Sequence, residues 1–242
     1  MLSTLRLPRG VGALFAGVGI WLSLGLTGCG LISSDVTNVD IALDKKFTID
    51  TGGWQVSQPT ADQYLAQSCE SSPGVCDAAV DQFCSMNCSG TCNEAQQCDL
   101  SLNISLSQAI NLVMEKPELK MLNDESVIKV GIDSVTYEIE FNNLTIDTPA
   151  LTVYLGPATG FRPADPGVKA VGTISPIPSK TTSAPRPLTF TATGQAELVS
   201  TMSMFKTPFN VVIGSSIVLT AGQALPSGKL DAVVRITGHA GL

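Results

Sequence analysis

The sequence predicts a mainly β protein: an antiparallel β-sandwich or barrel-like domain with one or two short helices and a small disulfide-rich insert. The first observation is that apolar and polar residues alternate in successive runs over residues 100–242, as in strands with one buried face. The second is that only short helical segments separate these runs, which favours antiparallel pairing. The length of 242 residues, with 44% hydrophobic and 14% charged residues, fits one large or two small domains and excludes a disordered chain.

The first strands are expected in residues 39–58, where apolar and polar residues alternate from Val39 to Ile49. Four further strands are expected in the first half of the β domain, residues 100–242. They lie at residues 100–106, 128–132, 135–141 and 151–155. Between residues 107 and 122 the apolar spacing is helical, but Pro117 interrupts any long helix.

Residues 156–187 contain seven prolines and are expected to form a loop or a broken edge strand, because proline cannot donate a ladder hydrogen bond. Alternation resumes at residues 188–192. Residues 194–206 predict a helix that ends before Pro208 and packs on the sheet through Leu198, Met202 and Phe205. Three more runs complete a count of about eight strands. They lie at residues 211–213, 217–219 and 230–236.

The N-terminal segment has the features of an export signal. Two arginines precede sixteen residues without charge, residues 11–26, a run shorter than the roughly 20 apolar residues that span a bilayer. The segment ends in Leu26-Thr27-Gly28-Cys29. This tetrapeptide resembles the lipobox of bacterial lipoproteins at all four positions.

The resemblance implies where the protein is held. In bacterial lipoproteins the cysteine of this motif carries acyl chains such as palmitate, and the signal peptide is cut off before it. Residues 1–28 are then expected to be a signal peptide, Cys29 the lipidation site and residues 29–38 a lipidated tether. Because each buried CH₂ contributes about 0.8 kcal/mol, two or three chains would anchor the protein permanently. Gly30, rather than Asp, follows the cysteine, which by the same resemblance implies the outer membrane.

The other six cysteines lie within residues 59–99, which we expect to form a disulfide-stapled insert with short helices near 60–67 and 76–87. They are Cys69, Cys76, Cys84, Cys88, Cys92 and Cys98. Export places them in an oxidising compartment, where an even cluster predicts disulfides. Metal binding is the alternative, but the spacing has no CxxC pair and no histidine is near. The spacing leaves all fifteen pairings open.

The sequence contains no GxSxG, HExxH or P-loop motif and no GxGxxG after a strand. The one histidine, His239, is expected to be exposed at a frayed C-terminus. Glu138 and Glu140 fit the polar face of a strand, whereas a catalytic pair needs two carboxylates that face each other. We therefore expect no enzymatic activity, no catalytic residue, no cofactor and no metal.

The charge of the chain and the expected lipid anchor indicate which partners to expect. The chain has 21 Asp and Glu against 14 Lys and Arg and no basic block, so we expect no nucleic-acid partner. We expect contact with the membrane through lipid on Cys29, and an envelope protein or a lipid as ligand. The predicted function is a non-enzymatic binding or structural module of the bacterial envelope. The alternatives are a carrier of a lipid or other apolar ligand in the β domain and a carboxylate-dependent envelope hydrolase.

Overall fold

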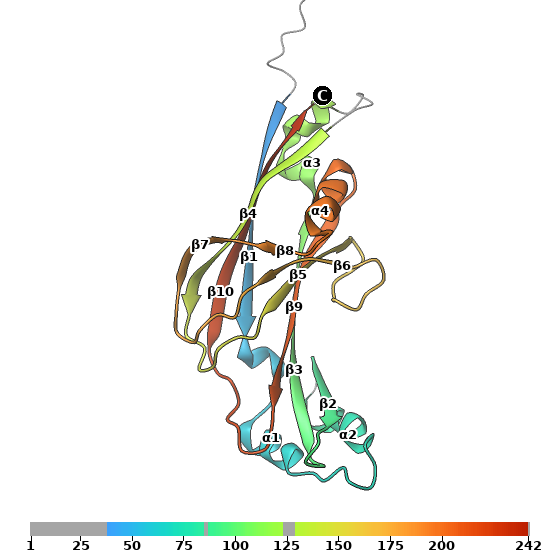
Figure 1. Ribbon diagram of the computed structural model, residues 1–242, viewed down its shortest axis with the longest axis vertical. Helices are drawn as coiled ribbons and strands as arrows, with labels where there is room; N and C mark the ends of the chain where they lie inside the picture. Colours follow the sequence, from blue (N-terminus) through green and yellow to red (C-terminus); the bar gives the residue numbers. More distant parts are fainter. Residues whose placement is uncertain (1–37, 85–86, 123–128, 242) are drawn as a thin grey trace, which may run out of the picture. The chain divides into compact units, whose positions relative to one another are not determined.

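Two antiparallel sheets form the framework of the described chain, as the alternating sequence patterns predict (Figure 1). The computed structural model describes residues 38–84, 87–122 and 129–241, all within one unit of residues 35–242. The expected signal peptide, the lipidation site Cys29 and the tether up to residue 37 lie outside the described residues. Apolar side chains from both sheets form one buried core, so the fold is a β-sandwich.

The smaller sheet has four strands in the order β1-β10-β4-β7. Their bounds are Asn38–Asp50 for β1, Lys229–Gly241 for β10, Lys129–Asn142 for β4 and Ser183–Pro187 for β7. The first and last long strands pair along their whole length, from Asn38 opposite Gly241 to Asp50 opposite Lys229. The start of the described chain is therefore tied directly to its end.

The larger sheet has six strands in the order β2-β3-β9-β5-β6-β8. Their bounds are Cys88–Cys92 for β2, Cys98–Ile110 for β3, Phe209–Leu219 for β9, Leu151–Pro157 for β5, Lys169–Ile174 for β6 and Thr189–Phe190 for β8. The runs predicted at 211–213 and 217–219 are one strand, β9. Gly214 to Ser216 continue its pairing with β3, although they lack the apolar residues that signal a strand.

The proline-rich stretch of residues 156–187 is partly loop and partly strand. β7 contains Pro185 and Pro187 and lies at the end of its sheet, where it pairs only with β4. This position matches the prediction of a broken edge strand, because proline has no N–H to offer a second neighbour. The proline-free residues 169–174 form β6, an additional strand that pairs with β5.

Four α-helices are present in the described chain: α1, Gln58–Leu65; α2, Val75–Phe83; α3, Leu112–Glu115; and α4, Gly194–Ser203. Two 3₁₀ helices, η2 and η3, cover Thr51–Trp54 and Pro117–Leu122. α1 and α2 fall where short helices were expected in the insert. The helical spacing predicted from residue 107 was wrong at its start, because β3 continues to Ile110 and α3 has one turn only.

Helix α4 ends earlier than the sequence predicts. It stops at Ser203, before Pro208 is reached, and the N–H of Met204 bonds to the carbonyl of Thr201 in a tighter turn. The three predicted packing residues, Leu198, Met202 and Phe205, are all buried. None of the described helices has the length and apolar character needed to cross a bilayer.

One residue of the predicted core lies on the wrong face. Alternation places Phe141 inside with Tyr137 and Ile139, but Phe141 is 45% exposed and Asn142 is buried instead. The cause is a β-bulge: Asp231 pairs with Phe141 and Ala232 with Ile139, so Glu140 is an extra residue that reverses the alternation.

Candidate functional site

The six cysteines of the insert form three disulfides, as predicted. The pairs are Cys69–Cys92, Cys76–Cys98 and Cys84–Cys88. The sulfur atoms of Cys69, Cys76 and Cys98 lie within 4.8 Å of one another, close enough for a shared ion. Each is already bonded to a second sulfur, so it offers no thiolate, the form that ligates metals.

Hydrogen bonds hold the helices of the insert together and fix the segment that leads into it. The buried Tyr64 hydroxyl of α1 donates to the Cys76 carbonyl of α2 at 2.9 Å, and the Trp54 indole N–H donates to the Asn103 carbonyl of β3 at 3.1 Å. A side chain on Gly90 of β2 would overlap the Tyr64 hydroxyl, which explains a glycine there. Burial, with the negative charges of Asp77 and Asp99, raises the pKa of Tyr64 to about 12. These contacts are structural.

Two carboxylates of β4 face cations on other strands of the smaller sheet. Arg235 of β10 lies against Glu138 of β4, and Lys46 of β1 lies 3.0 Å from Glu140. The hydrogen bond and charge of Glu140 raise the pKa of Lys46. A glycoside hydrolase needs two carboxylates facing the bond to be cut. Glu138 and Glu140 each face a cation instead, which matches the polar-face interpretation.

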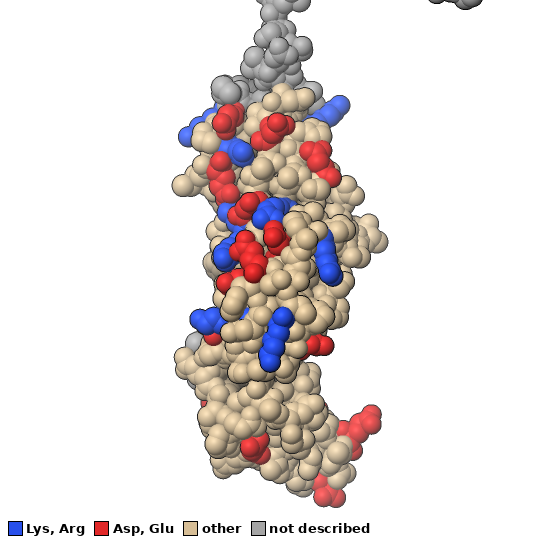
Figure 2. Space-filling view, turned by 90° about the vertical axis from the view of Figure 1, so that its left-hand side faces the viewer, with Lys and Arg blue, Asp and Glu red and all other residues tan. Residues whose placement is uncertain are grey.

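Charge is unevenly distributed along the described chain. No Lys or Arg occurs between Lys46 and Lys116. Figure 2 shows the consequence: on this face the end built by α1, α2 and β2 carries acidic side chains only, while Lys and Arg lie further up, together with more Asp and Glu. The insert (residues 59–99) therefore has no cation of its own to offer an anionic ligand.

His239 is not at a frayed end, and that prediction was wrong. β10 extends to Gly241 because it stays paired with β1 and β4, and His239 lies opposite Gly131. Its Nδ1 atom is 3.1 Å from a carboxylate oxygen of Asp133, and the side chain is half exposed, as expected. Within the described residues this pair stands on the sheet surface and lines neither of the two pockets described next.

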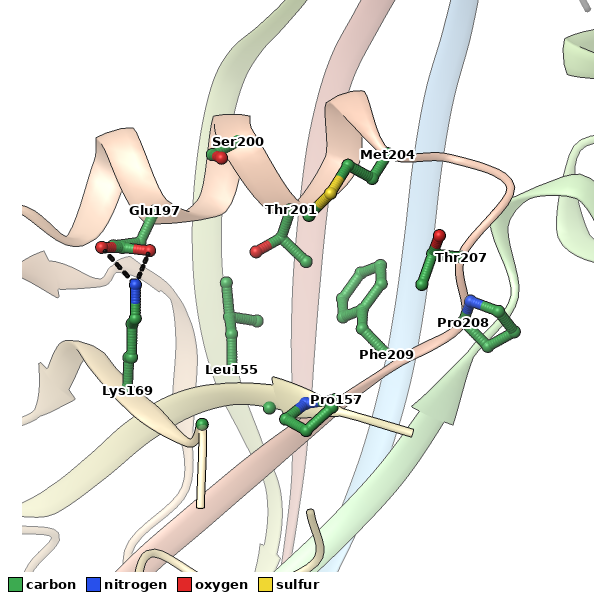
Figure 3. A pocket seen from close by; sticks show the side chains of 12 residues that line it. Leu155, Pro157, Lys169, Glu197, Ser200, Thr201, Met204, Thr207, Pro208 and Phe209 are labelled. Carbon is green, nitrogen blue, oxygen red and sulfur yellow. Dashed lines mark hydrogen bonds and ion pairs between the residues drawn. The ribbon is translucent and has the colours of Figure 1, made fainter. Parts of the chain in front are cut away.

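The first pocket lies between α4 and the ends of β5 and β9, and we call it the helix pocket. It has a volume of about 340 Å³. Its lining includes Leu155, Pro157, Ser200, Thr201, Met204 and Phe209. In Figure 3 the residues of α4 stand on one side of the space and those of β5 and β9 on the other.

The helix pocket has one charged edge. Lys169 of β6 lies 2.9 Å from both carboxylate oxygens of Glu197 on α4, and this ion pair closes the pocket on one side (Figure 3). The opposite side is apolar, with the buried ring of Phe209 and the 56% exposed side chain of Met204. The pocket is therefore suited to an apolar group with a polar end.

The position of α4 is fixed, so the helix pocket is preformed. α4 contacts β4 of the smaller sheet and β5 and β6 of the larger one, and thus bridges the two sheets. Leu198 and Met202 are buried beneath it. Its first residue is Gly194, where any side chain would collide with the carbonyl oxygen of Val171 in β6. This close approach sets the distance between helix and sheet.

The second pocket, the sheet groove, lies on the outer face of the larger sheet. Its volume is about 750 Å³. Its lining includes Asn103, Ser105, Thr152, Tyr154, Arg162 and Ser216. In contrast to the helix pocket, most of these side chains carry hydroxyl, amide or guanidinium groups.

One loop, residues 158–168, separates the two pockets. The buried side chain of Asn210 donates to the carbonyl oxygens of Pro157, Ala158 and Gly160, at 3.3, 3.2 and 2.8 Å. Gly167 of this loop lines the helix pocket, and Arg162 lines the sheet groove. Asn210 therefore holds the wall that both pockets share.

No model of a known protein family matches the chain, and a comparison with curated proteins finds no match. The two pockets must therefore be interpreted from their own chemistry. The sequence did not predict either of them. The lining of the helix pocket comes from four separate elements, with Leu155, Lys169, Glu197 and Phe209 as examples. No local sequence pattern indicates that these residues lie close together.

Proposed function

We propose that the chain is a membrane-anchored lipoprotein of the bacterial envelope and serves as a non-enzymatic binding module. The anchoring part rests on the Leu26-Thr27-Gly28-Cys29 motif after an uncharged segment. Three disulfides are in keeping with an exported protein, because they persist in oxidising compartments.

The binding part rests on one observation: the preformed helix pocket with its apolar floor. Ligand pockets are concave and mostly apolar, with a few polar groups that orient the ligand. Met204 and Phe209 supply the apolar surface, and the Lys169–Glu197 pair supplies the polar edge. The ligand that fits is an acyl-chain end, or an apolar side chain of an envelope protein.

A second candidate, a carrier of a whole lipid, is favoured by the same apolar lining, but size argues against it. The pocket of about 340 Å³ is at the small end of ligand sites, which run from about 300 to 1,000 Å³. The space between the sheets is occupied by buried side chains such as Ile139, Val153 and Ile213. A short apolar group is therefore the better ligand.

The experiment is a titration of the full chain, held in lipid nanodiscs and labelled with ¹³C at the methionine methyl groups. Octanoate is the probe. We expect the NMR signal of Met204 to shift to saturation while that of Met114, which is 76% exposed and outside the pocket, does not. Thr201→Trp, which fills the pocket, should abolish the shift. Parallel, unsaturable shifts of both signals would contradict the proposal.

A further inference from the structure

The outer face of the larger sheet is polar where three strands lie side by side. Asn103 of β3 is opposite Ser216 of β9, and Thr152 of β5 is opposite Gly214 of β9. Tyr154 follows on the same face of β5 as Thr152. A polar outer face alone is what any sandwich presents to water. The groove needs a further feature to be a binding site.

That feature is the loop of residues 158–168, which stands over the face as a fixed wall. Besides the three bonds from Asn210, the carboxylate of Asp165 accepts from the backbone N–H groups of Phe161 and Arg162 at 2.8 and 3.0 Å. Pro163 rests on Gly214, where any side chain would push the loop away. The backbone of Arg162 is therefore held in place at the edge of the groove.

Unlike many polar groups of the domain, the side chains of Arg162 and Tyr154 are not engaged by other described residues. Among the described residues, neither the Arg162 guanidinium nor the Tyr154 hydroxyl makes a side-chain hydrogen bond or ion pair. Arg235 and Lys169, by contrast, are neutralised by glutamates. A cation on a rigid loop beside a groove is available to an incoming anion.

The chemistry of the groove selects a class of ligand. Hydroxyl and amide groups donate and accept hydrogen bonds, as sugar hydroxyls require, whereas an apolar ligand would leave them unpaired. An arginine binds a carboxylate through two parallel hydrogen bonds. A volume of about 750 Å³ is within the range of ligand sites. One arginine in an acidic chain does not suit a nucleic acid, which needs several cations.

We propose that the sheet groove binds a carboxylate-bearing oligosaccharide, with Arg162 on the carboxylate and with Asn103, Ser216 and Tyr154 on the sugar hydroxyls. The choice of a glycan rests on this polar lining, and the role of the groove as a binding site rests on the proposed function as a binding module. The groove is a separate site from the helix pocket, on the other side of the 158–168 loop.

The test is calorimetric titration of the full chain in detergent with trigalacturonic acid and with its methyl ester, which lacks the charge. We expect the acid to bind about ten- to a hundredfold more tightly than the ester, the effect of one charged hydrogen-bonded pair. Arg162→Gln should lose that factor for the acid and nothing for the ester. Arg186→Gln, an exposed arginine on β7 outside the groove, is the matched control.

A second variant, Ser216→Trp, fills the groove and should abolish binding of both sugars. The proposal is overturned if the unaltered chain binds neither sugar at millimolar concentration, if acid and ester bind equally, or if the two arginine variants behave alike. Membrane fractionation and the octanoate titration test the proposed function separately. Failure there with retained binding of trigalacturonic acid would leave the groove assignment standing.

Discussion

Asn210 donates a hydrogen bond of 2.8 Å to the carbonyl oxygen of Gly160, which joins the buried start of β9 to the loop between the two pockets. The same amide also reaches two neighbouring carbonyls. One side chain therefore sets the geometry of two candidate binding sites.

Asn210→Ala should destabilise the protein and loosen that loop. The change leaves the three carbonyls without their donor, at a cost of about 1–3 kcal/mol. Urea unfolding measures the loss, and hydrogen exchange should rise in residues 158–168. Gln108→Ala, which removes an exposed amide on β3, is the control and should cost under about 0.5 kcal/mol. Unchanged exchange in the loop would contradict the role given to Asn210.

The disulfides should contribute unequally to stability. Cys76–Cys98 closes a span of 22 residues, whereas Cys84–Cys88 closes a span of four. Loop entropy alone predicts about 3 kcal/mol for the longer and about 2 kcal/mol for the shorter. Cys76 and Cys98 are also fully buried and fasten α2 to the first residue of β3.

Replacing Cys76 and Cys98 with alanine should therefore lower the free energy of unfolding more than replacing Cys84 and Cys88. Denaturant unfolding of the two double variants makes the comparison. Peptide mapping without reduction identifies the pairs, and the unreduced protein should weigh six hydrogens less than the reduced one. A different pairing, or four titratable thiols, would overturn the arrangement.

Much of the fold follows from local pattern. Period-two alternation located β1, β5 and β10, because each has one buried face, and the spacing of Leu198 and Met202 located α4. It divided β4 into two strands, 128–132 and 135–141, whereas the structure has one continuous strand. The alternation pattern predicted the wrong burial where a strand departs from strict alternation. A single extra residue, Glu140, reverses the direction of Phe141, and no local signal marks such a bulge.

Other features depend on contacts between distant residues, so the sequence alone did not show them. β3 begins at Cys98 and thus crosses the boundary expected between residues 99 and 100, because its first residues pair with β2 of the insert. The cysteine pairing depends on where α2 and β3 meet. Both pockets are lined in part by the 158–168 loop. The prolines of this region predicted only that it would be irregular.

The β-bulge at Glu140 leads to a prediction for which the alternation pattern and the structure give different results. Ile139→Asp places an unpaired charge at a site only 2% exposed and should unfold the domain, at a cost of several kcal/mol. Phe141→Asp, two residues away, should be tolerated, because Phe141 is 45% exposed. Circular dichroism and thermal melting compare the two variants. Equal loss of structure in both would show that Phe141 belongs to the core after all.

Lipid anchoring predicts the behaviour of a Cys29→Ala variant. Without the cysteine there is no site for acyl chains, so the protein should remain unprocessed or leave the membrane. Cell fractionation and the mass of the mature protein measure both effects. Cys84→Ala, which removes a cysteine from the insert, is the control and should leave processing unchanged. A Cys29→Ala protein that is still cut and membrane-bound would refute the anchoring proposal.

The raised pKa of Tyr64 predicts that the folded protein loses stability at alkaline pH. Burial raises its pKa to about 12, with further contributions from Asp77 and Asp99, against about 10 in an unfolded chain. The folded state therefore holds the phenolic proton more tightly than the unfolded state. The corresponding stability is fully present below about pH 10 and is lost as the pH rises through about 12.

Rapid urea unfolding at a series of alkaline pH values, completed before the disulfides exchange, should show this decline, and tyrosinate absorbance should follow the same step. Tyr64→Phe has no proton to lose, so its stability should depend less on pH in this range. It should start about 1 kcal/mol lower at neutral pH, because the Cys76 carbonyl loses its donor. Tyr154→Phe, in the sheet groove, should keep the full decline. If Tyr64→Phe lost stability as steeply as the unaltered chain, the alkaline transition would belong to another group.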